Sequence, residues 1–336
     1  MHRMIKKKFI NICLVNELFD LEEETIISLN RNMALYKGND AYLHFIKPYL
    51  DTLGSDLWYN YFENKVIPNK KTNIPKLVSL PENKWRYTII HSNHGMLSKE
   101  EIIALRLSDL RLKILVQTGF ETNSKWEIPD DGYQRYVSKN SFETFNLLTQ
   151  TSELISIIGS EKFVRKEPTK IDTRNFQLSL NKVNKIFKDP ELVFIKKSLE
   201  DFFSLEIIPE ESPFRIVSIF SIIELLITTS TKNLGEQSIS RQLSNKIGLL
   251  YNNFFKNFSI DEYFKGSDSN SIYTIIDKLY SYRSDIAHGN IPKLERELII
   301  IQQNMKNVLP FLNELLINLL IVAIQKPDII RDLKRC

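Results

Sequence analysis

Residues 271–289 read SIYTIIDKLYSYRSDIAHG and carry the clearest helical pattern in the chain. One apolar face recurs in steps of four, three and seven residues at Ile272, Ile276, Leu279 and Ile286. Arg283 fills the missing step on that face. A guanidinium on the inner face of a bundle costs several kcal/mol unless it is paired or lines a polar cleft. We therefore expect Arg283 to have a carboxylate partner.

A second predicted helix, residues 213–229, supplies a candidate for that partner. Between Ile216 and Ile227 almost every position is apolar, which is typical of a helix buried on most sides. Glu224 is the carboxylate in the middle of this run. We infer an ion pair between Glu224 and Arg283.

His288 and Gly289 predict the end of the helix that carries Arg283, because glycine favours the left-handed conformation that terminates helices. A histidine in the last helical turn suits acid–base chemistry near neutral pH. Five residues correspond to about 140° around an ideal helix, so Arg283 and His288 converge only if the helix loosens there or a second subunit completes the site. Arg86 and His91 have the same spacing within a predicted strand, and we interpret that copy as coincidence.

Five helical segments follow one another after residue 190, joined by short polar connections, which predicts an all-α bundle. They are 191–205, 213–229, 236–254, 271–288 and 294–325, the last with a bend at Pro310. The predicted fold class is mainly α, with this bundle over 191–336 and a mostly helical N-terminal domain with a few short strands over 1–160.

The first 160 residues give mixed signals. Helical spacing occurs at 21–33, 41–66 and 98–118. The last of these opens with a capping-box pattern, Ser98 followed three residues later by Glu101. Residues 85–90 have the composition of a short strand, and the proline-bearing segment 68–84 predicts an exposed connection. We find no chemical role for this half, which could sense a trigger, select a substrate or bind an inhibitor.

Residues 161–190 are rich in lysine and arginine and form the predicted boundary between the two domains. We favour a solvated linker or helix face, and contact with the phosphates of RNA is the alternative. The residues assigned to that alternative are Lys162, Arg165, Lys166 and Lys170.

Composition limits the remaining classes of protein. The 336 residues are 43% apolar, which is enough to form substantial cores. The net charge of +4 is compatible with a polyanionic partner but does not indicate one. Cys13 and Cys336 are too far apart in sequence to indicate a disulfide framework, and no secretion signal precedes them, so a reducing cytoplasm is the expected location. The apolar runs 214–227 and 308–324 are interrupted by charge or proline, and we expect buried helices rather than membrane spans.

The stretch from Tyr282 to Gly289, late in a five-helix unit whose second helix carries Glu224, resembles the HEPN superfamily, most closely its Apea-type and abortive-infection branches. The resemblance covers about residues 191–326. It implies a metal-independent endoribonuclease that dimerises and brings two Arg-x4-His motifs into one cleft, and it implies a toxin or antiviral effector. No cofactor is implied.

The residue types fit RNA cleavage without a metal. One His288 could accept the proton of the 2′-OH, the His288 of a second subunit could protonate the leaving 5′-oxygen, and Arg283 could hold the charge on the phosphoryl oxygens. The products would be a 2′,3′-cyclic phosphate and a 5′-OH. Supporting positions are Tyr282, Ser284, Asp285 and Glu224; Asp285 could orient His288 or an arginine.

Other functions stay open. The runner-up is a non-catalytic binding module that docks RNA, a nucleotide or a partner protein, with Arg283 in a structural pair. A metal hydrolase would need a ligand cluster, and His91 and His94 lack a third ligand, so we interpret them as unrelated loop histidines. The expected partners are RNA, with tRNA as one candidate, a second copy of the chain, and a trigger or inhibitor acting on residues 1–160.

Overall fold

The computed structural model describes residues 9–15, 17–19, 27–37, 64–67, 76–79, 88–92, 97–108, 111–112, 114–121, 164–166, 173–209, 212–229, 238–255, 258–264, 271–290 and 299–336. Most of these residues are helical, which confirms the mainly α class. The chain divides into two compact units, Met1–Leu178 and Ser179–Cys336, and the boundary lies inside the basic segment 161–190.

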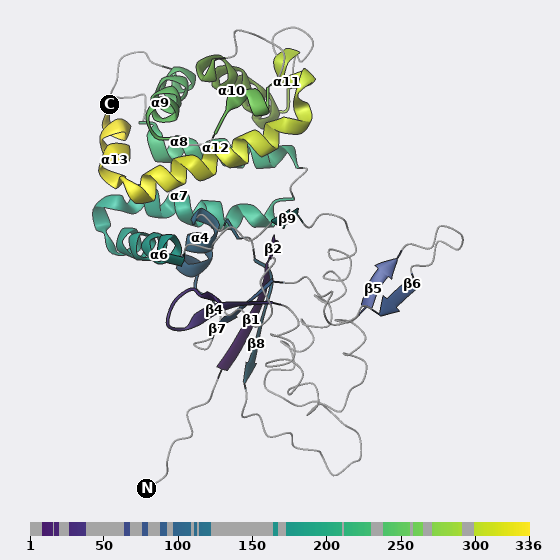
Figure 1. The fold of residues 1–336 in the computed structure, drawn as a ribbon. Coiled ribbons are helices and arrows are strands. Elements are labelled where there is room, and N and C mark those ends of the chain that lie inside the picture. Colours follow the sequence, from purple (N-terminus) through teal and green to yellow (C-terminus); the bar gives the residue numbers. More distant parts are fainter. Residues whose placement is uncertain are drawn as a thin grey trace, which may run out of the picture. The chain divides into compact units, whose positions relative to one another are not determined.

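The described part of the first unit is built around a five-stranded antiparallel sheet in the order β3-β4-β7-β1-β8 (Figure 1). The strands are β1 Phe9–Val15, β3 Ile27–Ser28, β4 Met33–Lys37, β7 Thr88–Ser92 and β8 Ile114–Glu121. Two smaller pairs are β2 Glu17–Phe19 with β9 Val164–Lys166, which is parallel, and β5 Asn64–Ile67 with β6 Lys76–Ser79, which is antiparallel.

Among the described residues of the first unit strands predominate, in contrast to the mostly helical N-terminal domain expected from the sequence. Within 21–33 the described residues form β3, a turn and the start of β4, because the Asn30 side chain accepts the N–H groups of Asn32 and Met33 and reverses the chain. The predicted helix at 41–66 is wrong at its described end, which belongs to β5. The predicted connection 68–84 contains β6, whereas the short strand expected at 85–90 is confirmed in β7.

Helix α4, Lys99–Leu107, confirms the capping box, since the N–H of Ser98 donates to Glu101 at 2.8 Å and the N–H of Glu101 donates to the Ser98 hydroxyl at 3.2 Å. The helix is shorter than the predicted 98–118. It ends at Ser108, Arg111 takes a positive φ of 46°, and the β-branched run that follows joins the sheet as β8.

The second unit is a helical bundle, and the four predicted helices between 191 and 288 are confirmed (Figure 1). The basic segment is not an irregular linker where it is described, because it forms β9 and α6. The helices are α6 Thr173–Lys188, which crosses the unit boundary, α7 Val193–Ser204, α8 Pro213–Ile227, α9 Ile239–Phe254, α10 Ile272–His288, α11 Ile299–Gln303, α12 Met305–Gln325 and α13 Pro327–Arg335.

Residues 294–325 differ from the expectation of one helix bent at Pro310. The break falls at Asn304, whose backbone (φ −117°, ψ 23°) separates α11 from α12, and Pro310 lies inside α12. Helix α12 is long and apolar enough to cross a membrane by length and composition alone. Its side chains Leu315, Leu316 and Leu319 are fully buried, and the helix packs on α8, as expected of a core helix.

Helix α8 is the centre of the bundle and contacts α7, α10, α12 and α13. Two lysines satisfy the carbonyl groups at its C-terminal end. Lys334 of α13 donates to the carbonyls of Leu225 and Thr228, both at 2.6 Å, and Lys246 of α9 donates to that of Ile227 at 3.0 Å. A cation at a helix C-terminus stabilises the negative end of the dipole. Three helices are thus joined at one point.

Replacing Lys334 with methionine keeps the apolar stem and removes both hydrogen bonds. We expect Lys334→Met to lower the free energy of unfolding by about 1–3 kcal/mol, since hydrogen bonds from a charged donor are lost and carbonyls are left unpaired. Urea denaturation measures this. The adjacent exposed residue gives the control, Arg335→Met, which should stay within about 0.5 kcal/mol of the original chain; equal effects of the two changes would contradict the assigned role of Lys334.

Candidate functional site

Arg283 and Glu224 form the ion pair expected from the sequence. The Arg283 Nη2 atom of α10 lies 3.2 Å from the Glu224 Oε1 atom of α8, and the two side chains are 18% and 21% exposed. The pair therefore lies at the edge of the core, where one side still reaches solvent. The pair connects α10 to α8, the two helices between which the sequence predicted an ion pair.

Tyr280 is a member of this site that the sequence analysis missed. Its hydroxyl hydrogen-bonds to the Glu224 carboxylate, and its ring centroid lies 5.4 Å from the Arg283 guanidinium carbon. Phe220 of α8 packs edge-on against the same ring at 5.7 Å. Its position in the sequence could have identified it, because Tyr280 precedes Arg283 by three residues and so shares its face of α10.

Burial dominates the electrostatics of the pair. It raises the pKa of Glu224 above its ordinary value, and the Arg283 charge and the Tyr280 hydrogen bond oppose that rise only in part. Burial also raises the pKa of Tyr280, which keeps its proton for donation.

Hydrogen-bonding capacity remains at the pair. Glu224 Oε1 and Arg283 Nε are both buried and have no well-aligned hydrogen bond within the described residues. The pair is thus held by charge attraction and by the Tyr280 hydroxyl. The Arg283 side chain is still 18% exposed, so the bundle does not fully enclose it.

His288 is exposed in the last turn of α10, which stays helical through this residue. Gly289 then takes a left-handed φ of 67°, its N–H donates to Ile286 at 3.2 Å, and the N–H of Asn290 donates to Asp285 at 2.9 Å. The helix therefore does not loosen between Arg283 and His288. At 100° per residue their side chains point about 140° apart, so one subunit does not bring them together.

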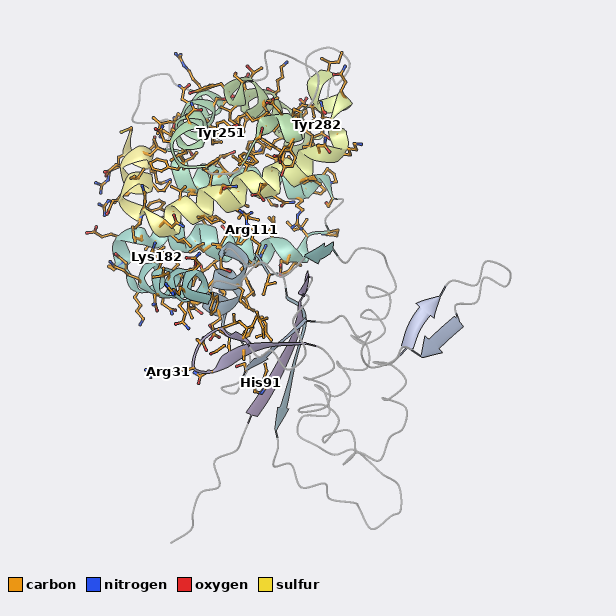
Figure 2. All side chains as sticks on the ribbon, in the orientation of Figure 1. Arg31, His91, Arg111, Lys182, Tyr251 and Tyr282 are labelled. Carbon is orange, nitrogen blue, oxygen red and sulfur yellow. The ribbon has the colours of Figure 1, made fainter. Side chains whose placement is uncertain are left out.

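The other supporting residues of α10 do not take part in the Arg283–Glu224 ion pair. Tyr282 donates to the sulfur of Met305 at 3.7 Å and is directed toward the start of α12, and burial raises its pKa (Figure 2). Ser284 and Asp285 are partly exposed, and neither side chain has a hydrogen bond to a described residue. Within the described residues, Glu224 is the member of the predicted polar group that forms an ion pair with Arg283.

The remaining sequence candidates lie in the first unit. Arg165 and Lys166 belong to β9, while Lys162 and Lys170 fall outside the described residues. His91 lies within strand β7 and not in a loop, because its backbone pairs with β1 and β4 (Figure 2). Arg86 and His94 are also outside the described part of the chain. Among the residues that are described, no three His, Cys, Asp or Glu side chains are grouped to hold a metal.

Comparisons with protein-family models, curated proteins and solved structures give no match to this chain.

Glu224 should make stability depend on pH in a defined direction. Because its folded pKa lies above the ordinary value of 4.5, the folded chain holds the proton more tightly than the unfolded chain. Stability is then lost as the pH rises from about 4.5 through the folded pKa. We expect the free energy of unfolding to fall over that window relative to Glu224→Gln, which cannot titrate. Urea titrations of both proteins from pH 4 to 8 measure the difference, and a difference that is flat or rises with pH would contradict the burial of Glu224.

Proposed function

We propose that this protein is a metal-independent endoribonuclease of HEPN type in which Arg283 binds a phosphoryl group of RNA. The single observation that supports it most is the placement of Arg283. The guanidinium lies on an otherwise apolar helix face and is oriented by Glu224 and Tyr280, and the Arg283 side chain is 18% exposed. A preorganised guanidinium of this kind is suited to the charge that develops on phosphoryl oxygens during cleavage.

His288 is the proposed acid–base group. Its imidazole is exposed to solvent at the end of α10, as a group that must reach the 2′-OH or the leaving 5′-oxygen requires. Because the regular helix separates it from Arg283 by about 140°, we propose that two copies of the chain form the site, each giving an arginine and a histidine to a shared cleft.

The chemistry uses the nucleophile that RNA itself carries. The oxygen of the 2′-OH attacks the adjacent phosphorus and gives its proton to one His288, while the second His288 gives a proton to the leaving 5′-oxygen. A 2′,3′-cyclic phosphate and a 5′-OH result, and DNA is inert because it lacks the 2′-OH. Asp285 could orient His288. Lys162, Arg165, Lys166 and Lys170 are proposed to contact the RNA backbone.

The biological setting belongs to the same proposal. A cytoplasmic toxin or antiviral effector of the abortive-infection kind would need its nuclease restrained, and residues 1–160 are the proposed receiver of a trigger or inhibitor. Cellular RNA, with tRNA as a candidate, is the proposed substrate.

A second candidate is a non-catalytic module that docks RNA, a nucleotide or a partner protein. The ion pair itself favours it, because Glu224 neutralises Arg283 within one subunit and could serve packing alone. The two candidates differ in one respect that can be measured. A module binds without cutting, and its binding does not require His288.

Cleavage by purified protein separates the two candidates. We expect the original chain to cut total RNA and tRNA in EDTA and to leave cyclic-phosphate ends, and we expect Arg283→Ala and His288→Ala each to lower the rate at least about 100-fold, as for other acid–base and oxyanion groups. Gel analysis and end-group assays measure this, with circular dichroism to establish folding.

Arg241→Ala is the matched control, since Arg241 is exposed on α9 of the same bundle and has no place in the proposed site. Its rate should stay close to that of the original chain. RNA binding that survives His288→Ala, without cleavage of total RNA or tRNA by the original chain either alone or with extract of phage-infected cells added as a source of a trigger, would establish the module instead.

Mixing the two inactive variants tests the shared site. A heterodimer of Arg283→Ala and His288→Ala retains one arginine and one histidine, whereas each variant alone lacks one of the two groups entirely. We expect the mixture, unfolded and refolded together, to recover part of the cleavage that both separate proteins lack. Size-exclusion chromatography with light scattering gives the oligomeric state. A monomer with full activity would contradict the two-subunit site.

A further inference from the structure

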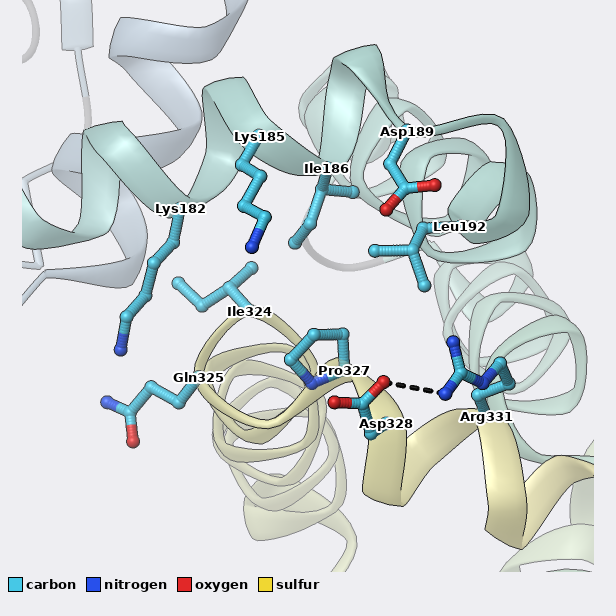
Figure 3. A pocket seen from close by; sticks show the side chains of 10 residues that line it. All are labelled: Lys182, Lys185, Ile186, Asp189, Leu192, Ile324, Gln325, Pro327, Asp328 and Arg331. Carbon is cyan, nitrogen blue, oxygen red and sulfur yellow. Dashed lines mark ion pairs between the residues drawn. The ribbon is translucent and has the colours of Figure 1, made fainter.

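A pocket of about 220 Å³ lies within the second unit. It is enclosed by the end of α6, the 3₁₀ turn Pro190–Leu192, the end of α12 and the start of α13 (Figure 3). Its volume is below the roughly 300–1,000 Å³ of pockets that enclose drug-sized ligands. We therefore expect it to take one end of a ligand.

Two lysines of α6 carry the uncompensated charge of this pocket. Lys182 and Lys185 are three residues apart, so they share one face of the helix, and both side chains extend toward α12 (Figure 3). Neither ammonium group has a hydrogen bond or an ion pair with a described residue. Two neighbouring cations without an ion-pair partner among the described residues favour an anion.

The two carboxylates of the pocket are already engaged. Asp328 pairs with Arg331 at 2.7 Å, and Arg331 also contacts Glu191 at 3.3 Å. The Asp189 carboxylate accepts the N–H of Glu191 at 2.9 Å and caps the 3₁₀ turn. The lining has three cations, Lys182, Lys185 and Arg331, against these two carboxylates, which leaves an excess of one positive charge.

The rest of the lining is apolar. Ile186, Leu192 and Ile324 are nearly or fully buried and form the floor with Pro327. Gln325 adds an exposed amide at the rim. An apolar floor beside two lysines fits a small ring or alkyl group joined to an anionic head.

We infer that this pocket binds a phosphate monoester, with the phosphate at Lys182 and Lys185 and its organic group on the apolar floor. A dianion suits two ammonium groups three residues apart better than a single carboxylate does. Both a free small phosphate ester and the phosphorylated 5′ end of an RNA present this chemistry. The inference is independent of the proposed cleavage, because none of its residues belongs to the Arg283 site.

Calorimetric titration of the full chain with phenyl phosphate tests the pocket, with phenol and inorganic phosphate as the two halves of that probe. We expect phenyl phosphate to bind more tightly than either half. Lys182→Gln together with Lys185→Gln should weaken it at least about tenfold, since two charge-assisted hydrogen bonds are lost. Gln325→Lys adds a cation at the rim and should tighten binding.

Lys188→Gln is the matched control, because it removes the same charge from an exposed position of α6 that does not line the pocket. It should change the affinity by less than about twofold. Displacement of phenyl phosphate by uridine 5′-monophosphate but not by a 5′-phosphorylated RNA trinucleotide would identify a free phosphate ester as the ligand. Displacement by both would show that the pocket also accepts the 5′ end of an RNA. No binding of phenyl phosphate, or equal weakening by Lys188→Gln and by the double variant, would overturn the inference.

Discussion

The contact between Arg283 and Glu224 is the constraint on which the bundle and its proposed chemistry depend. A charged pair at the edge of a core is retained only if both partners stay together, because loss of either leaves the other desolvated and unpaired. That condition fixes the register of α10 against α8 at one point. Tyr280 and Phe220 strengthen the same contact, so the guanidinium is oriented before any ligand arrives.

The two helices that carry this pair, α8 and α10, end in different ways. At the end of α8, Lys334 and Lys246 bind the last carbonyl groups and connect α13 and α9 to the helix that carries Glu224. At the end of α10, Gly289 terminates the helix immediately after His288. A rigid helix between Arg283 and His288 keeps the two side chains apart in one subunit, and this geometry is the reason for proposing a site that two subunits share.

The bundle was more predictable from sequence than the first unit. The apolar periodicity predicted both helices, because helical periodicity is a local property of the sequence. The ion pair was predicted because Arg283 and Glu224 are charged residues on apolar faces, and a buried charge needs a partner. The sheet was missed, since the pairing of β1 with β7 and β8 joins residues far apart in sequence and leaves little local signal. Ser98 predicted where α4 begins, but its end at Ser108 was set by the pairing of β8. Tyr280 was missed because a tyrosine on a half-buried face is typical of ordinary packing.

Exchanging the two charges of the pair tests whether Arg283 has a role beyond packing. The double variant Arg283→Glu with Glu224→Arg keeps an ion pair between α8 and α10 and moves the guanidinium to the other helix. We expect its free energy of unfolding to lie within about 1 kcal/mol of that of the original chain, while metal-free RNA cleavage stays absent. Recovery of cleavage together with stability would contradict a role for Arg283 in binding the phosphoryl group, because Arg283 would then be no more than one half of a structural pair.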